Sequence, residues 1–153
     1  MKKATNLLLS LRKDSELVLV KPLNFKAAKS NKCFQNAAYF CESRNGFAIV
    51  SGWLVGDDFG SKGTVLIPHY WVKEIESNNY FDTTPKNKED NQSYEYVLDF
   101  DIFRYGTATS YLPPPVFIFP DNKLKVRLNQ NNFIPLNSID VEELYSLRRA
   151  QAN

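Results

Sequence analysis

One helical pattern followed by a series of strand-like segments limits what this chain can fold into. Between Lys32 and Glu42 apolar residues recur at the spacing of a single helix face, and Asn45-Gly46 ends the pattern. Segments rich in β-branched and aromatic residues follow, separated by turn signals. Strands are expected near residues 47–55, 69–75, 79–82, 94–103, 116–119 and 123–128. The pattern predicts an α+β fold in which this helix packs on an antiparallel sheet.

The two ends of the chain add one expectation each. Residues 16–20 form either a short apolar strand or the end of a lead-in that covers residues 1–29. Residues 140–150 are predicted to form a terminal helix, with Asp140 and Glu143 placed as a capping box. Neither an internal repeat nor a second domain is visible, so a single domain spanning residues 1–153 is expected.

Two polar segments are expected to be surface loops. Residues 56–63 are rich in glycine, and residues 83–93 contain few apolar side chains. Because both flank strands of the predicted sheet, they are candidate borders of a binding cleft. Ser30 or Asn31 is expected to cap the helix that begins near Lys32.

Charge and hydrophobicity exclude several classes of function. The formal net charge is only +2, so no nucleic-acid partner is expected. The apolar run at residues 7–11 is shorter than the core of a signal peptide, and no segment approaches a membrane span of about 20 apolar residues. The sequence is therefore interpreted as a soluble, cytoplasmic protein without a membrane partner, and a protein partner remains possible.

The cysteines are expected to be two free thiols. Cys33 and Cys41 lie on one predicted helix, separated by roughly 12 Å along its axis, which is too far for a disulfide. One histidine and two distant cysteines do not supply a metal site, and no phosphate-binding loop is present. No cofactor is expected. Cys41 is predicted to be a core residue.

Cys33, His69 and Asp82 supply the three groups that thiol catalysis requires: a thiol, a base and a group that orients the base. A cysteine at a helix start gains thiolate stabilisation from free backbone N–H groups, which can also bind an oxyanion. His69 is the only histidine in the chain, and its predicted strand places His69 and Trp71 on one face. Asp82 follows a tight turn whose pairing brings it close to the level of Val72 or Lys73, and a modest register change would bring its carboxylate to the imidazole. The hypothesis is a Cys33 nucleophile, a His69 base and acid, and an orienting Asp82.

This arrangement resembles the transglutaminase-like branch of the papain-like cysteine hydrolase superfamily. His69-Tyr70-Trp71-Val72 is similar to the His-Ala-Trp signature of that branch, and Asp82-Thr83-Thr84-Pro85 to its Asp-Pro-Thr-like segment. The resemblance covers roughly residues 30–85 and departs from the family at Tyr70, where alanine is frequent, and at the Thr-Thr-Pro order. It implies a papain-like or transglutaminase-like core and chemistry through a thioester.

Three further residues are candidates for binding substrate. Asn36 shares a helix face with Cys33 and is either an oxyanion or substrate-orienting donor or a solvated polar residue. Gln35 is a weaker candidate, and Trp71 either lines the cleft or belongs to the core. The predicted function is a hydrolase or acyltransferase of the peptidase or amidase type that acts on a peptide or a small acyl or amide substrate. The near-neutral net charge argues against a strongly charged substrate. The alternative is a catalytically inactive binding or inhibitor module on the same fold.

Overall fold

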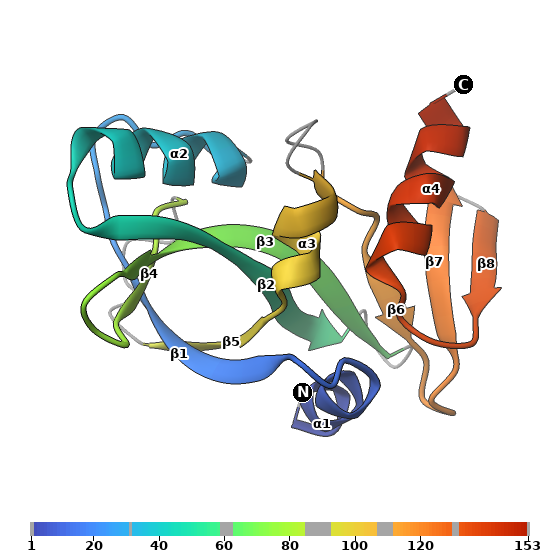
Figure 1. Ribbon diagram of the computed structural model, residues 1–153. Coiled ribbons are helices and arrows are strands. Elements are labelled where there is room, and N and C mark those ends of the chain that lie inside the picture. The colour runs from blue at the N-terminus through green and yellow to red at the C-terminus, as the bar shows by residue number, and fades with distance from the viewer. Residues whose placement is uncertain are drawn as a thin grey trace.

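The protein has a mixed α+β fold. The computed structural model describes residues 2–30, 32–58, 63–84, 93–106, 112–129 and 132–152, and within them it contains four helices and eight strands (Figure 1). The elements in chain order are α1 (Lys2–Leu11), β1 (Glu16–Pro22), α2 (Cys33–Ser43), β2 (Phe47–Asp58), β3 (Thr64–Glu74), β4 (Tyr80–Asp82), β5 (Tyr94–Leu98), α3 (Phe100–Gly106), β6 (Val116–Ile118), β7 (Leu124–Asn129), β8 (Asn132–Leu136) and α4 (Val141–Ala152). No helix among these is long and apolar enough to cross a membrane.

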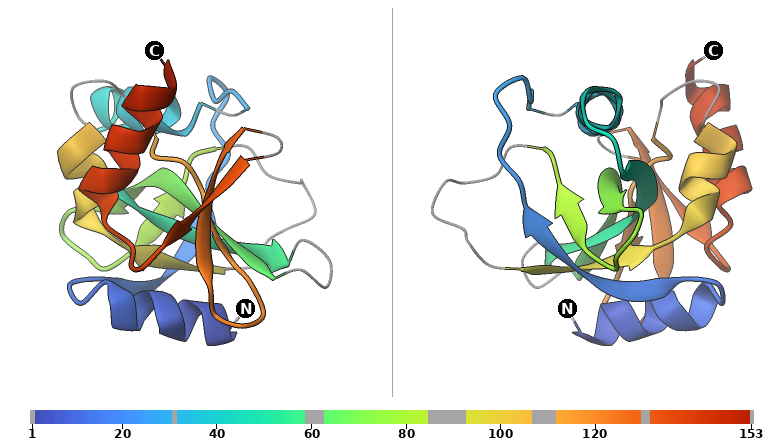
Figure 2. Two further views of the ribbon diagram at one scale, coloured as in Figure 1. Left: turned by 90° about the vertical axis from the view of Figure 1, so that its right-hand side faces the viewer. Right: turned by 60° about the vertical axis from the view of Figure 1, so that its left-hand side comes forward.

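The sheet is partly barrel-like. Its strand order is β2-β5-β1-β4-β3-β6-β7-β8, and β3 also pairs with β2, so the first five strands close on themselves. Strands β6, β7 and β8 continue from β3 as an antiparallel extension, against which α4 lies (Figures 1 and 2). The predicted antiparallel sheet is confirmed for every described pairing except that of β1 with β4, which is parallel.

Among the described residues, one edge of β3 has no strand partner at its centre. Strand β2 pairs along one side of β3, whereas the other side pairs with β6 only at residues 64–66 and with β4 only at residues 72–73. Continuing the β6 register would place residues 113–115 beside the centre of β3, and all three are prolines, which have no N–H to donate. The unpaired stretch of β3 contains His69.

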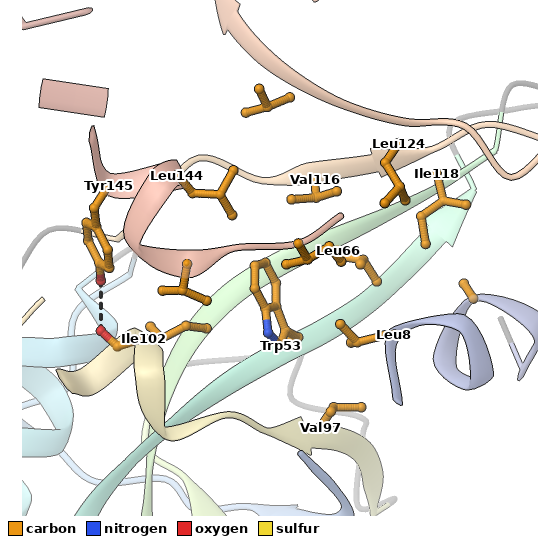
Figure 3. Packing of buried hydrophobic residues seen from close by; sticks show 14 of the residues in the cluster. Leu8, Trp53, Leu66, Val97, Ile102, Val116, Ile118, Leu124, Leu144 and Tyr145 are labelled. Carbon is orange, nitrogen blue, oxygen red and sulfur yellow. Dashed lines mark hydrogen bonds between the residues drawn. The ribbon is translucent and has the colours of Figure 1, made fainter. Parts of the chain in front are cut away.

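Buried side chains form clusters on both faces of β3. One cluster combines Trp53 and Leu66 of the sheet with residues of all four helices, including Leu8, Ile102 and Leu144 (Figure 3). The other is enclosed by the five closed strands and includes Trp71 and Tyr96. Since side chains alternate along a strand, Tyr70 and Val72 of β3 face the helices, while His69 and Trp71 face the barrel interior.

Several sequence predictions are confirmed. Helix α2 matches the expected helix at residues 32–42, β1 contains the expected strand at residues 16–20, and β4 and α4 lie where they were predicted. The Asp140 side chain accepts a hydrogen bond from the Glu143 N–H at 3.2 Å, as a cap of α4 should. The Ser30 cap of α2 is wrong, because Lys32 occupies the N-cap position without a side-chain bond. Asn31 lies outside the described residues.

Four other predictions are corrected. The strand expected at residues 94–103 ends at Leu98, and α3 begins at Phe100 because Asp99 caps it by accepting the Asp101 N–H at 3.2 Å. Helix α1 replaces the expected lead-in, and β8 was not predicted. The loop expected at residues 56–63 begins later, because β2 extends to Asp58. Residues 59–62 of this loop and 85–92 of the second loop lie outside the described chain.

Candidate active site

Cys33 is the first residue of α2. The helix packs against β3 through Ala37 and Phe40, which contact Val72. The Asn36 N–H bonds to the Lys32 carbonyl at 2.8 Å, so the first turn begins at the cysteine. The N–H groups of a first helical turn have no acceptor within the helix, and they favour negative charge beside them. Cys33 therefore lies at the positive end of α2.

His69 and Asp82 are directly hydrogen-bonded. The distance from His69 Nε2 to Asp82 Oδ2 is 2.9 Å. Pairing of Val72 with Phe81 and of Lys73 with Tyr80 sets Asp82 opposite Trp71, so that its carboxylate lies diagonally across from His69 on the same face. The sequence had placed Asp82 level with Val72 or Lys73. The observed register is one step further along β3, and this shift brings the carboxylate to the imidazole.

The Asp82 carboxylate is fixed by two more donors. The Tyr96 hydroxyl donates to Oδ2 at 2.6 Å, and the Thr84 N–H donates to Oδ1 at 2.9 Å. Burial raises the pKa of Asp82, but the hydrogen bond and charge of His69, with these two donors, lower it below its ordinary value. Burial and the neighbouring Asp82 charge in turn raise the pKa of Tyr96, so its hydroxyl stays protonated as a donor. Asp82 is therefore a buried anion whose partners hold it in place.

His69 also interacts with the Cys33 side chain. Burial lowers the pKa of His69, but the hydrogen bond and charge of Asp82, together with the effect of Cys33, raise it to about 9. Asp82 binds Nε2, which leaves Nδ1 as the other ring nitrogen. Helix α2 packs on the face of β3 that carries Val72. The structure thus brings together the three residues singled out from the sequence.

Two aromatic rings hold the imidazole. The Trp71 ring stacks on His69 with a centroid distance of 6.2 Å and an interplanar angle of 22°. The Tyr96 ring meets His69 edge-on at 5.9 Å. Trp71 is fully buried, so it forms the wall behind the imidazole and belongs to the core rather than to an open cleft. Cys33 and His69 are 9% and 8% exposed, respectively, so both side chains are buried.

Asn36 bonds to the loop before α2, and Gln35 is exposed on the same helix. The Asn36 amide accepts the Lys29 N–H at 2.9 Å and donates to the Lys29 carbonyl at 2.7 Å. Asn36 is buried and ties the preceding loop to α2, a role that the sequence did not suggest. Gln35 is exposed and lines a pocket on the outer side of the same helix.

Tyr70 and Tyr145 lie near Cys33, and the sequence did not identify them as site residues. Both hydroxyls donate to the Ile102 carbonyl, at 3.3 Å and 2.9 Å, respectively (Figure 3 shows the second bond). Burial, followed by smaller effects that include the Cys33 charge, raises the pKa of each phenol. Tyr145 belongs to α4, so the terminal helix reaches the surroundings of the cysteine. Nothing in a local pattern signals such a long-range contact.

Within the described chain, no group of three or more His, Cys, Asp or Glu residues is placed to hold a metal ion. Both cysteines are free thiols. No protein-family model, curated protein or solved structure gives a match to the chain. The likeness of residues 30–85 to transglutaminase-like enzymes therefore remains a hypothesis drawn from the motif residues.

Proposed function

We propose that this protein is a thiol-dependent hydrolase or acyltransferase of the peptidase or amidase type. The observation that best supports the proposal is the hydrogen bond between His69 and the buried Asp82 carboxylate, next to a cysteine that begins a helix and contributes to the raised pKa of His69. In this role Cys33 is the nucleophile, His69 the general base and acid, and Asp82 the orienting carboxylate.

The reaction proceeds in two halves. Cys33 gives its proton to His69, and the thiolate attacks a substrate carbonyl while first-turn N–H groups of α2 bind the oxyanion. His69 then donates the proton to the departing amine, the C–N bond breaks, and a thioester remains. In the second half, His69 removes a proton from water or an incoming amine, which attacks the thioester and releases the thiolate. Water gives a carboxylic acid product, and an amine gives a new amide.

A transglutaminase-like core is the finer fold proposal. A helix that starts with the nucleophile, a strand that carries the histidine and a following strand that carries the aspartate occur in that order and in one hydrogen-bonded site. The supporting elements are α2, β3 and β4. The remaining elements have no counterpart in the resemblance on which this proposal rests.

Selective alkylation tests the proposal. We expect mild iodoacetamide treatment near neutral pH to modify Cys33 before Cys41, because burial raises the pKa of the Cys41 thiol and keeps it protonated. His69→Ala should slow the alkylation of Cys33 by about tenfold or more, since the variant lacks the proton acceptor. The alkylation rate of Cys41 should not change. Peptide mass spectrometry reports both sites in one sample, so Cys41 is an internal control. Equal rates at the two cysteines would rule out an activated Cys33.

The small exposure of Cys33 and His69 favours one alternative, a catalytically silent binding module. A peptidyl electrophile larger than iodoacetamide separates the two functions. An enzyme should be labelled at Cys33 by such a probe, and His69→Ala should abolish the labelling. A binding module should react with iodoacetamide alone, because its site admits only a small reagent.

A further inference from the structure

A pocket of about 460 Å³ lies on the outer flank of α2, beside the first turn. Its described lining consists of Ala27, Lys29, Lys32, Gln35, Asn36 and Tyr39. The Tyr39 ring stacks on Phe25 at 6.1 Å, and Phe25 meets Phe40 edge-on at 5.6 Å. These contacts order the loop that forms one wall, so the pocket is part of the folded structure.

The loop that walls the pocket connects the two sides of the candidate active site. At one end the Leu23 N–H donates to the Asp82 carbonyl at 2.9 Å. At the other end the Lys29 backbone is held by both atoms of the Asn36 amide. On the helix side, Lys32 lines the pocket and is bonded directly to Cys33 in the chain. The pocket therefore lies beside the first turn of α2, the turn that begins with Cys33.

The lining favours a negatively charged group. Lys29 and Lys32 contribute two positive charges, and none of the described lining residues is acidic. The Tyr39 ring and the lysine stems provide apolar surface, and the Gln35 amide adds a donor. The positive end of α2 adds to the same field. The low net charge of +2 argued against a strongly charged substrate, but the pocket concentrates positive charge locally.

We propose that this pocket binds a carboxylate carried by the substrate, so that the preferred substrate is a peptide with an acidic side chain beside the reacting carbonyl. The proposal rests on the thiol chemistry proposed above and adds a specificity to it. Lys29 and Lys32 are the specificity-determining residues, and Tyr39 supports the methylene groups of the acidic side chain.

Two alkylating reagents that differ in charge test the pocket without a known substrate. Iodoacetate carries a carboxylate and iodoacetamide is neutral, so the ratio of their rates at Cys33 reports attraction of an anion to the site. In the Lys29→Gln, Lys32→Gln double variant, this ratio should fall about three- to tenfold at low salt, which is the effect expected of two nearby charges near a protein surface. Adding 1 M NaCl should abolish the difference, because charges are then screened within about 3 Å.

Lys26→Gln is the matched control, because Lys26 is an exposed lysine of the same loop that does not line the pocket. Its ratio should stay at the wild-type value. The double variant should fold normally, because the Lys29 bonds to Asn36 use backbone atoms and the Lys32 side chain forms no cap. An unchanged ratio in the double variant, or an equal fall in Lys26→Gln, would overturn the proposal.

A binding measurement separates failure of the pocket from failure of the enzyme. N-acetylglutamate α-amide, whose only charge is the side-chain carboxylate, should shift the backbone amide resonances of Lys29, Gln35 and Tyr39, whereas its neutral isostere N-acetylglutamine α-amide should not. The shifts should disappear in the double variant. If Cys33 proves unreactive, the proposed function is wrong. The resonance shifts still test whether the pocket binds a carboxylate. Equal effects of the two ligands, or no effect of either, would overturn the carboxylate specificity.

Discussion

The protonation of His69 can be followed alone, because it is the only histidine in the chain. Its pKa of about 9 exceeds the ordinary value of 6.5, since hydrogen bonds and charges of Asp82 and Cys33 outweigh the effect of burial. We predict that NMR of the imidazole gives a midpoint near 9 in the wild type. Asp82→Asn should bring it below 6.5, because burial then acts with little opposition. An unchanged midpoint in Asp82→Asn would exclude the carboxylate as the cause.

The raised pKa of His69 makes the stability of the fold depend on pH. A pKa raised in the folded state means that protonated His69 stabilises the fold fully below pH 6.5 and loses this contribution as the pH rises through about 9. Urea unfolding of the wild type should therefore show a fall in stability over this interval. The same experiment on Asp82→Asn should show a weaker fall.

The site residues differ in how far the sequence could predict them. Cys33, His69 and Asp82 each carry distinctive chemistry, and Cys33 and Asp82 lie at the ends of elements with clear local signals. Tyr96 reaches the site because β5 pairs with β1, and Tyr145 reaches it because of the position of α4. No local sequence pattern encodes either arrangement. Asn36 was singled out because it shares a helix face with Cys33, but only the structure shows its amide bonded to Lys29.

At the scale of elements, Asp99 explains why a strand was predicted where a helix forms. Its Oδ2 accepts Arg12 Nε at 2.8 Å and Trp53 Nε1 at 2.9 Å, and its Oδ1 caps α3. The sequence shows alternating residues up to this position and cannot show the two distant donors. Helix α1 was missed for a related reason: it has no acidic residue in its first turn and no basic residue in its last turn, and only burial of Leu8 shows its role.

We predict that Asp99→Ala destabilises the fold by roughly 2–4 kcal/mol, because it leaves Arg12 and the buried Trp53 donor without their acceptor. Asp101→Ala is the control. Its carboxylate also bonds to Arg12 but is 34% exposed, so the loss should be about 1 kcal/mol or less. Equilibrium urea denaturation measures both. Equal losses in the two variants would show that Asp99 does not join these elements.

At the scale of the whole molecule, the five closed strands and the β6–β8 extension share β3. The order of helix and strands was predictable from local patterns, whereas the closure of β2 on β3 and β5 and the parallel pairing of β1 with β4 are non-local. The sequence also predicted a single domain. The helix-covered cluster and the cluster enclosed by the five strands meet at β3. Each contains one of the two tryptophans, Trp53 and Trp71, so fluorescence can test whether the two clusters unfold together.

In Trp53→Phe, fluorescence reports the cluster enclosed by the five strands through Trp71, and in Trp71→Phe it reports the helix-covered cluster through Trp53. Because β3 contributes buried residues to both clusters, neither can unfold while the other keeps its packing. We therefore expect the fluorescence midpoint in urea to coincide with the far-ultraviolet circular dichroism midpoint within each variant. The absolute midpoints should differ between variants, since Trp53→Phe also removes the donor to Asp99. A fluorescence transition that precedes the loss of secondary structure in one variant would show that its cluster unfolds independently, and the single domain would then have to be divided at β3.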